Sequence, residues 1–222
     1  YEIVFGDGSS DVCSSDLVNP KIILASNSPR RRYLLERAGL SFSVVPSTID
    51  ETALPADDPF TLVQALAEAK ASEVAARFPE SWVIAADTLV VVEDRVLGKP
   101  ASEEQARDML ARLSGRTHQV LTGYCLCCLR RERRISEVVS TDVLCKSLTP
   151  AEIDWYIRTG EPFDKAGAYA IQGIGTFLVK RIDGSYTNVV GLPVCEVIEH
   201  LIRERVVGWD PAAANALQVQ TR

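Results

Sequence analysis

The sequence predicts an α/β fold. Short apolar segments such as "KIILA" alternate with helical segments along the first part of the chain, which is typical of this class. A longer segment, "WVIAADTLVVVE", is apolar on both sides of a central Asp-Thr, as in a strand that is buried on both faces. With 222 residues, of which 46% are hydrophobic, the chain can form one large domain or two closely packed lobes.

The first elements are predicted to be a strand, a helix and a second strand. "KIILA" is the first strand, and "SFSVVP" is the second. Between them a helix runs from Ser28 to Gly39, because Ser28 can cap it and Pro29 suits the first helical position. After the polar loop "STIDETALPADD", a long helix begins at Asp58-Pro59 and includes the alanine-rich "LVQALAEAKASEVAARF".

The second half of the chain is predicted to add a hairpin and three more helices. "EDRVLG" reads as a turn and a return strand, and "SEEQARDMLARLSG" as a helix with Ser102 and Gln105 in capping-box spacing. Two extended segments, 117–129 and 135–148, are joined by the charged hairpin tip "RRERR". A helix begins at Thr149, "TFLVKRI" forms a strand, and a last helix covers about 192–205.

Composition limits the classes of function. A formal net charge of -6 argues against broad, sequence-independent binding to nucleic acid, which needs a basic surface. No apolar run approaches the roughly 20 residues that span a bilayer, and no segment has the pattern of a secretory signal, so a cytoplasmic location is the default. The cluster "YCLCCL" could suggest zinc, but it lacks a second spaced Cys or His pair, which favours buried free thiols.

The ends of the chain differ in character from its centre. Residues 1–18 have turn and disorder composition, and "DVCSSDL" is also the translation of a common sequencing-adapter oligonucleotide. We therefore expect residues 1–18 to be a non-native leader and residues 19–205 to form the functional domain. Residues 206–222 are expected to be a C-terminal tail.

Asp87 is the first candidate for chemistry. It lies in the middle of an apolar segment, where an unpaired carboxylate is costly to bury, so it needs a cation, a metal or several donors. A structural ion pair or a strand end that faces solvent would also explain it. If the loop that contains Asp50 and Glu51 folds back over this strand, the three acids would form an oxygen-rich site suited to Mg²⁺ or Mn²⁺.

Several polar and basic side chains could contact a polyphosphate beside these acids. Each is by default a surface residue, but in combination they suit a nucleotide substrate. Ser26, Arg31 and the amides that begin the first helix are predicted to face phosphate, whereas Arg32 is predicted to be a solvated surface charge. The full set is Ser26, Arg30, Arg31, Lys70, Lys99 and Lys165.

Two glycine-bearing segments, "AGAYAIQGIG" and "DGSYTNVVGLP", predict turns with positive φ that allow the backbone to approach a ligand closely. They match neither a P-loop nor a dinucleotide-binding motif, so an ATPase or a dehydrogenase is not supported. Gln172 lies between two such turns. It is either a reader of a nucleotide base or simply a polar turn residue.

Seven segments in order resemble one known family. They are "LASNSPRRRYLL", "IDE", "AADTLVV", "LGKP", "LSGRTHQVLTG", "FDKAGAYAIQGIG" and "GSYTNVVGLPV", and they extend from about Lys21 to Arg203. Together they resemble the Maf family of nucleoside triphosphate pyrophosphatases. The resemblance implies a mixed, twisted sheet with flanking helices and two lobes around a cleft, similar in architecture to the inosine triphosphate pyrophosphatases.

The resemblance also implies a reaction and a set of roles. The family hydrolyses a nucleoside triphosphate to the monophosphate and pyrophosphate with a divalent metal, generally as a cytoplasmic homodimer. The motif positions imply that Asp87 is the proton acceptor, that Glu51 is a metal or water ligand, and that both acids hold the metal. Lys70, Lys99 and Lys165 are the corresponding lysines.

Three positions separate the branches of the family by substrate. Arg30, Thr88 and Gln172 match the branch that acts on dTTP and UTP, whereas the 7-methyl-GTP branch usually has an aromatic residue after "SP" and Glu in place of the Gln. A Gln amide can serve both the carbonyl groups and the N–H of a pyrimidine. Two alternatives stay open, namely hydrolysis of modified nucleotides and a role as a nucleotide-binding regulator of septum formation.

Overall fold

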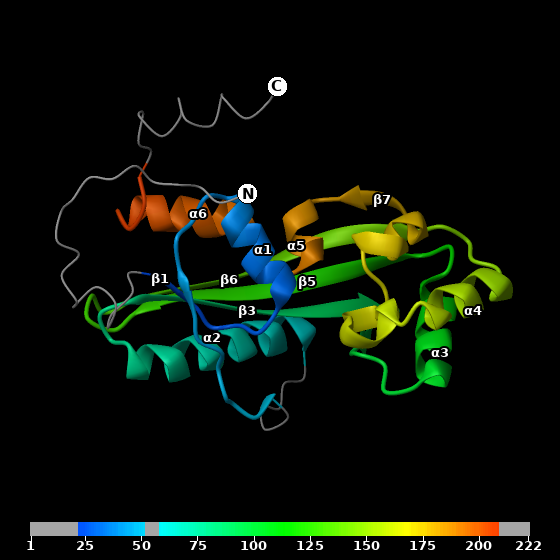
Figure 1. The fold of residues 1–222 in the computed structure, drawn as a ribbon, viewed down its shortest axis with the longest axis horizontal. Helices are drawn as coiled ribbons and strands as arrows, with labels where there is room; N and C mark the ends of the chain where they lie inside the picture. Colours follow the sequence, from blue (N-terminus) through cyan, green and yellow to red (C-terminus); the bar gives the residue numbers. More distant parts are fainter. Residues whose placement is uncertain (1–21, 52–57, 209–222) are drawn as a thin grey trace.

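The structure, a computed structural model, describes residues 22–51 and 58–208, so the expected leader and most of the expected tail lie outside the described residues. In this part of the chain a sheet of seven strands has the order β2-β1-β3-β5-β6-β7, with β4 beside β3 (Figure 1). β1 pairs in parallel with β2 and β3, and the other pairs are antiparallel, so the predicted mixed α/β sheet is confirmed. The strands are β1 (Ile22–Leu24), β2 (Ser43–Val44), β3 (Trp82–Val92), β4 (Arg95–Leu97), β5 (Thr117–Cys128), β6 (Arg133–Cys145) and β7 (Val179–Asp183).

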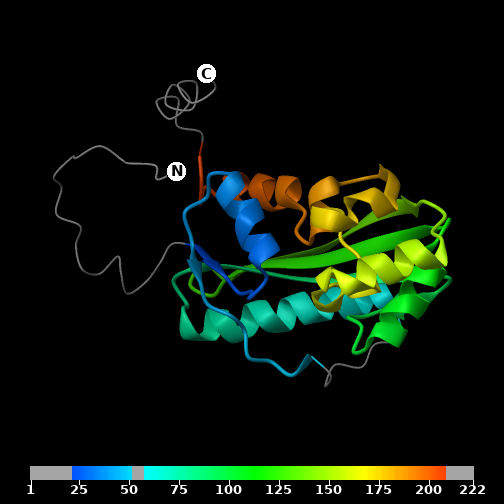
Figure 2. The same cartoon turned by 45° about the vertical axis from the view of Figure 1, so that its right-hand side comes forward.

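Helices cover both faces of the sheet. α2 packs on one face, α1, α5 and α6 lie on the opposite face, and α3 and α4 lie together at one end (Figures 1 and 2). Three short 3-10 helices, η2, η3 and η4, follow α4 along the chain. The bounds are α1 (Pro29–Arg37), α2 (Pro59–Arg77), α3 (Glu103–Leu113), α4 (Pro150–Arg158), η2 (Glu161–Asp164), η3 (Ala166–Ala168), η4 (Gly173–Leu178), α5 (Tyr186–Val190) and α6 (Val194–Arg203).

The helix starts follow the capping residues read from the sequence. Ser28 caps α1 by accepting a hydrogen bond from the backbone N of Arg31, and Thr149 and Glu152 form a complete capping box at α4. The expected box at α3 is incomplete. Ser102 Oγ accepts from the N of Gln105, but the Gln105 side chain accepts from the N of Ala101 rather than from the cap residue.

The middle strand β3 is buried on both faces, and its side chains alternate between two cores. Trp82, Ile84 and Ala86 belong to the core beneath α1 and α6, whereas Val83 and Ala85 pack against α2. Because side chains alternate along a strand, Asp87 continues the series that faces α2 and Thr88 continues the series that faces α1. The adjacent Asp-Thr of the sequence therefore serves two different faces of the sheet.

The cysteine cluster of β5 contributes to these cores. Cys125, Cys127 and Cys128 are buried, free thiols, and so is Cys145 of β6, which confirms the predicted buried thiols at these positions. Burial raises the pKa of Cys125 to about 12. Within residues 22–51 and 58–208, no group of three or more His, Cys, Asp or Glu side chains could hold a metal. Cys195 differs from the others because it is exposed.

Two elements near the C-terminal end differ from the prediction. The expected strand "TFLVKRI" begins only at Val179, because residues 173–178 form η4. The expected single last helix is preceded by a short separate helix, α5, and Gly191 with φ 126° separates α5 from α6. Among the described helices, none is both long and apolar enough to cross a membrane.

Candidate functional site

The candidate site lies where β3 lacks a neighbouring strand on one edge. Along its other edge, β3 pairs with β5 from Val83 to Val91. On the open edge, β1 pairs only with residues 82–84 and β4 only with residues 90–92. Within the described ranges, the part of β3 between these pairings has no strand beside it. Ligands of open α/β sheets bind beyond the carboxyl ends of parallel strands, and β1 ends at this gap.

A cavity of about 600 Å³ opens at this gap. Its size suits a small organic ligand. Its walls come from the connection between β1 and α1, from β3, from the segment after β4, and from the segments around η2, η3 and α5. Ten of the eleven residues that the sequence analysis selected line it, namely Ser26, Arg30, Arg31, Glu51, Lys70, Asp87, Thr88, Lys99, Lys165 and Gln172. Asp50, the third acid of the expected oxygen-rich site, is not part of the lining.

Lys70 of α2 joins two of the acids that were selected from the sequence. Its Nζ lies 2.7 Å from Asp87 Oδ1 and 2.7 Å from Glu51 Oε1. The side chains of Lys70 and Asp87 are only 10% and 14% exposed, whereas that of Glu51 is 57% exposed. Lys70 is therefore the cation that the burial of the Asp87 carboxylate requires.

Gly123 lets α2 approach the sheet closely at this point. It lies directly opposite Asp87 on β5. A Cβ at this position would stand 2.4 Å from the backbone oxygen of Val63, so only glycine allows the helix to lie this near. Lys70 is about two turns beyond Val63 and thus on the same face of α2. The glycine on β5 therefore helps to set the distance that Lys70 bridges.

Arg31 of α1 organises the other face of the site. Its guanidinium donates to Gly191 O at 2.7 Å, to Thr88 Oγ1 at 3.1 Å and to Ser26 Oγ at 3.2 Å. None of these acceptors is charged, and among the described residues Arg31 forms no ion pair. Burial lowers its pKa, and the charge of Asp87 partly opposes this effect. A positive charge without a carboxylate partner remains in the cavity wall.

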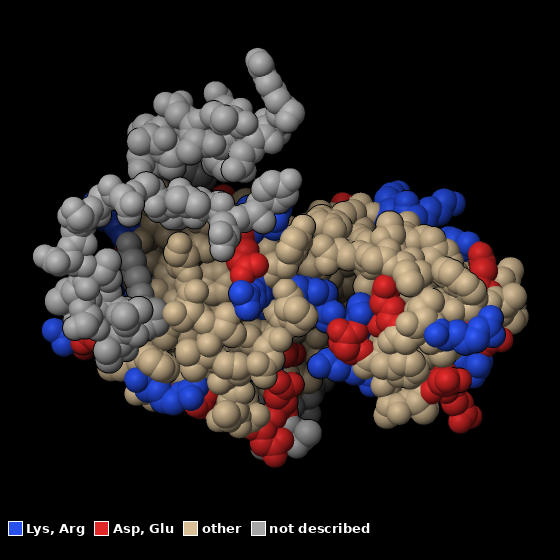
Figure 3. Space-filling model, in the orientation of Figure 1, with Lys and Arg blue, Asp and Glu red and all other residues tan. Residues whose placement is uncertain are grey.

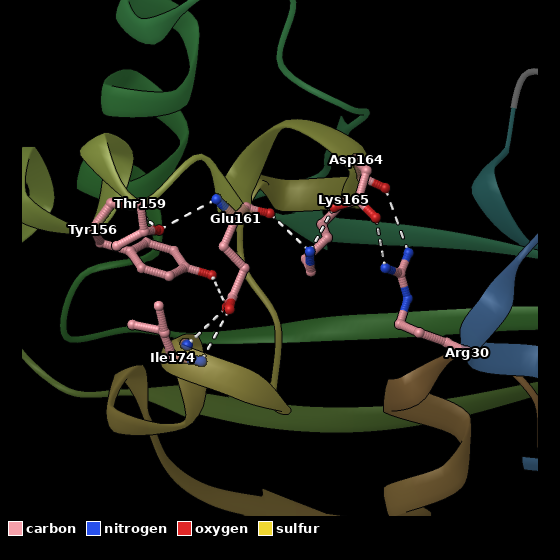
Figure 4. A network of polar contacts seen from close by, with 8 residues as sticks. Arg30, Tyr156, Thr159, Glu161, Asp164, Lys165 and Ile174 are labelled. Atoms are coloured by element: carbon pink, nitrogen blue, oxygen red, sulfur yellow. Dashed lines mark hydrogen bonds and ion pairs between the residues drawn. The ribbon is translucent and has the colours of Figure 1, made fainter. Parts of the chain in front are cut away.

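Arg30 connects α1 to η2. Its Nη1 lies 2.9 Å from Asp164 Oδ2, and Asp164 also contacts Lys165 Nζ at 2.5 Å (Figure 4). Burial would raise the pKa of Asp164, but the hydrogen bonds from Lys165 and Arg30 outweigh burial and lower it. Two cations selected as phosphate ligands thus share one carboxylate of the protein.

Lys99 and Gln172 complete the wall. Lys99 follows β4 and is exposed, and Gln172 precedes η4 and is half-buried. Neither side chain has a hydrogen-bond or ion-pair partner among the described residues. The lining also includes the buried side chains of Val90, Val120 and Tyr169. The cavity therefore combines charged groups with apolar side chains and the amide of Gln172.

The charge of the cavity is opposite to that of the chain. Within the described residues, its lining includes five cations and three carboxylates, although the formal net charge of the chain is -6. In Figure 3, basic and acidic side chains meet near the middle of this face of the molecule. A surplus of positive charge in a cavity attracts an anionic ligand.

Comparison with known proteins shows the family to which this sequence belongs. The sequence profile of one family, described as "Maf-like protein", matches residues 21–204. The chain belongs to the Maf family. Among curated relatives of this Maf protein, one from Syntrophus aciditrophicus (strain SB) is 50% identical over 185 residues, which is 83% of this chain and 90% of the relative. One from Halalkalibacterium halodurans is 51% identical over 180 residues, or 81% of this chain and 94% of the relative. One from Geobacter sp. (strain M21) is 48% identical over 190 residues, or 86% and 97%. All three are named "dTTP/UTP pyrophosphatase".

The acids of the Maf cavity offer the type of donor that a divalent cation such as Mg²⁺ prefers. Glu51 and Asp87 both line the cavity, where each contacts the Nζ of Lys70 at 2.7 Å. Mg²⁺ is commonly held by one or two carboxylates together with substrate phosphates and water. The donor set is hard and oxygen-only, as Mg²⁺ and Mn²⁺ prefer.

Sequence reasoning missed two acids of the Maf site. Asp164 pairs with Arg30 across 134 residues, and Glu161 contacts the loop that carries Gln172. Both lie in "EPFD", which reads as an ordinary polar turn. The two closely spaced glycines of "GIG" indicate that another group lies close to the backbone, but they do not identify that group. At Gly173 the protein's own Glu161 carboxylate makes this approach, and at Gly175 Ala170 O and Tyr156 Oη make it, where a ligand was expected.

Proposed function

We propose that this protein hydrolyses dTTP and UTP to the monophosphate and pyrophosphate, by attack of water on the α-phosphorus. One observation carries the proposal: Asp87 lies in a cavity where Arg31 and Lys99 have no carboxylate partner among the described residues. Such a cavity suits a polyphosphate, because its cations can neutralise the negative charge that builds up on the departing pyrophosphate. The names of the relatives support the choice of substrate.

In this proposal Asp87 accepts the proton of the attacking water, and Glu51 helps to orient that water. Lys70 holds the two carboxylates together. The basic side chains neutralise the phosphates as negative charge builds up on the departing pyrophosphate. Arg31 is fixed by three hydrogen bonds, so its charge is preorganised and needs little movement during the reaction.

Glu51 and Asp87 would hold a divalent metal, Mg²⁺ or Mn²⁺, which supplies charge stabilisation to the phosphates when it is bound. We also propose a cytoplasmic homodimer, as the family implies, and no nucleic-acid or membrane partner, as the net charge of -6 and the composition indicate. Light scattering of the purified protein would test the dimer, and fractionation of the native cells would test the location.

Base selection is assigned to Arg30, Thr88 and Gln172. The Gln172 amide has no partner among the described residues and lines the cavity together with apolar side chains, against which a base can be placed. Thr88 contributes through Arg31, because its Oγ1 accepts a hydrogen bond from that guanidinium. Arg30 joins α1 to η2 through its pair with Asp164.

The first experiment compares Asp87→Asn with wild type in an assay of pyrophosphate release from dTTP, UTP, CTP, 7-methyl-GTP and 5-modified pyrimidine triphosphates. We expect loss of more than 99% of turnover, because an amide cannot accept the proton. The control is Asp142→Asn, which changes an exposed acid that does not line the cavity. Undiminished dTTP hydrolysis by Asp87→Asn would refute the proposal, and faster wild-type turnover of modified pyrimidines would reassign the substrate.

The second experiment changes the amide to a carboxylate. Gln172→Glu keeps the shape of the side chain but removes its N–H donors, so pyrimidine carbonyl groups lose a partner. We expect kcat/KM for UTP to fall about tenfold or more, with a smaller change for a guanine nucleotide. An equal change for all bases would show that Gln172 does not read the base.

A further inference from the structure

The loop that carries Gln172 is fastened by a single carboxylate outside the cavity lining. Glu161 Oε1 accepts hydrogen bonds from Gly175 N and Tyr156 Oη, both at 2.8 Å, and Oε2 accepts one from Ile174 N at 2.9 Å (Figure 4). Tyr156 is fully buried in the core beneath α4. The carboxylate thus connects the rigid core to the start of η4, two residues beyond Gln172.

The two glycines of this loop lie close to the carboxylate and to the groups around it. A Cβ on Gly173 would stand 2.6 Å from Glu161 Oε2, and Gly173 has φ +70°, which favours glycine. A Cβ on Gly175 would stand 2.5 Å from Ala170 O, 2.6 Å from Tyr156 Oη and 3.0 Å from Glu161 Oε1. Gly173 therefore meets the carboxylate itself, whereas Gly175 meets mainly a backbone oxygen and the hydroxyl that holds the carboxylate. The Gly-x-Gly pattern reflects contacts within the protein.

The carboxylate is well suited to this task. Burial would raise the pKa of Glu161, but the two backbone N–H groups, the Tyr156 hydroxyl and Lys165 together outweigh burial and lower it. A charged acceptor gives stronger hydrogen bonds than a neutral one. The loop is further closed by Thr176 Oγ1, which donates to Gly173 O at 2.7 Å.

Glu161 also contacts Lys165, which is proposed to bind the phosphates, but it does so through its backbone oxygen. Its main-chain oxygen accepts a hydrogen bond from Lys165 Nζ at 2.7 Å. A change in the Glu161 side chain leaves this backbone oxygen in place. The side chain and the main chain of one residue therefore serve two different parts of the cavity, which an experiment can separate.

We propose that Glu161 is a positioning residue for base recognition, whose carboxylate fixes the 171–176 loop so that Gln172 faces the nucleotide base. The proposal rests on the proposed function, because it assumes that Gln172 contacts the base. It assigns Tyr156 a supporting part, as the core anchor of the carboxylate. It predicts an effect on the affinity for the base but not on the affinity for the phosphates.

The test measures Glu161→Gln and Tyr156→Phe beside wild type, with the exposed Asp154→Asn as control. In Glu161→Gln the amide NH₂ must face one of the three donors, so the loop loses its fixed position. We expect kcat/KM for UTP relative to a guanine nucleotide to fall about tenfold, mainly through KM, and about threefold in Tyr156→Phe. Competitive inhibition by pyrophosphate should stay within twofold of wild type.

The outcomes distinguish the positioning role of Glu161 from the proposed function of the protein. If UTP and pyrophosphate affinities fall together, or if neither discrimination nor KM changes, the positioning role is refuted. If Glu161→Gln does not fold, Tyr156→Phe decides, because the carboxylate and the backbone contacts to it remain. A wild-type protein that hydrolyses no pyrimidine triphosphate refutes the proposed function itself, whereas wild-type turnover with unchanged discrimination in the variants refutes this inference alone.

Discussion

Replacing Lys70 by methionine tests how far the stability of the fold depends on the site. Methionine keeps the length and apolar stem of the side chain but removes the ammonium that contacts Asp87 and Glu51 at 2.7 Å each. Asp87 would then be left in a strand that is buried on both faces, with a side chain only 14% exposed. The variant therefore creates a nearly buried carboxylate without its cation.

The size of the effect follows from the exposure of each partner. Removing one member of a buried ion pair costs about 3–5 kcal/mol, whereas an exposed pair contributes about 0–1 kcal/mol. The Asp87 contact belongs to the first class and the Glu51 contact, at 57% exposure, to the second. Because Asp87 keeps a little contact with solvent, we expect a loss of about 3 kcal/mol in the free energy of unfolding. For a chain of this size this lowers Tm by about 6–12 °C.

Urea unfolding can measure this loss through tryptophan fluorescence, to which Trp82, 2% exposed, contributes. The matched control is Arg107→Met, which removes the exposed pair with Asp154 and should cost less than about 1 kcal/mol. The double variant Lys70→Met/Asp87→Asn should recover at least half of the loss, because a neutral amide is cheaper to bury. A Lys70→Met protein no less stable than the Arg107→Met control would refute the reasoning.

Two further predictions concern residues that do not touch a ligand. Gly123→Ala should cost about 3 kcal/mol in unfolding free energy and lower turnover, because its Cβ would stand 2.4 Å from Val63 O and push α2 away. The control is Gly208→Ala, whose Cβ meets nothing within 4 Å and which does not line the cavity, and equal urea midpoints of the two variants would contradict us. Burial lowers the pKa of His118 to about 4, so between about pH 6.5 and pH 4 the unfolded chain binds a proton that the folded chain does not. The His118 contribution to stability is therefore complete above pH 6.5 and falls by about 3 kcal/mol as pH drops to 4. His118→Gln should show a shallower decline of unfolding free energy over this window, and parallel curves for the two proteins would argue against the assignment.

Much of the fold follows from local signals, and the site follows from residue chemistry. The caps at Ser28 and Thr149 mark helix starts because they act within one turn. Asp87 is conspicuous because a carboxylate in an apolar strand needs a partner, and the structure supplies Lys70. The sequence could not indicate which cation this would be, because several lysines were equally available.

The missed features share a physical cause. Asp164 and Glu161 act through partners that are brought near only by the tertiary fold, so nothing in their neighbouring residues distinguishes them from solvated acids. The late start of β7 has a similar origin, because the contact of Glu161 with Ile174 and Gly175 holds the preceding residues in η4. Local strand propensity is overridden by contacts of this kind.

The bond from Arg31 to Gly191 O joins positions 160 residues apart, whereas the β5–β6 hairpin pairs neighbouring segments. Contacts between distant positions form late in folding, because the entropy of loop closure must be overcome first. The middle of the sheet can therefore assemble before the ligand cavity exists. On a ribosome, Arg31 cannot contact Gly191 until nearly the whole domain has been synthesised, so recovery of activity on refolding should lag behind formation of the β5–β6 hairpin.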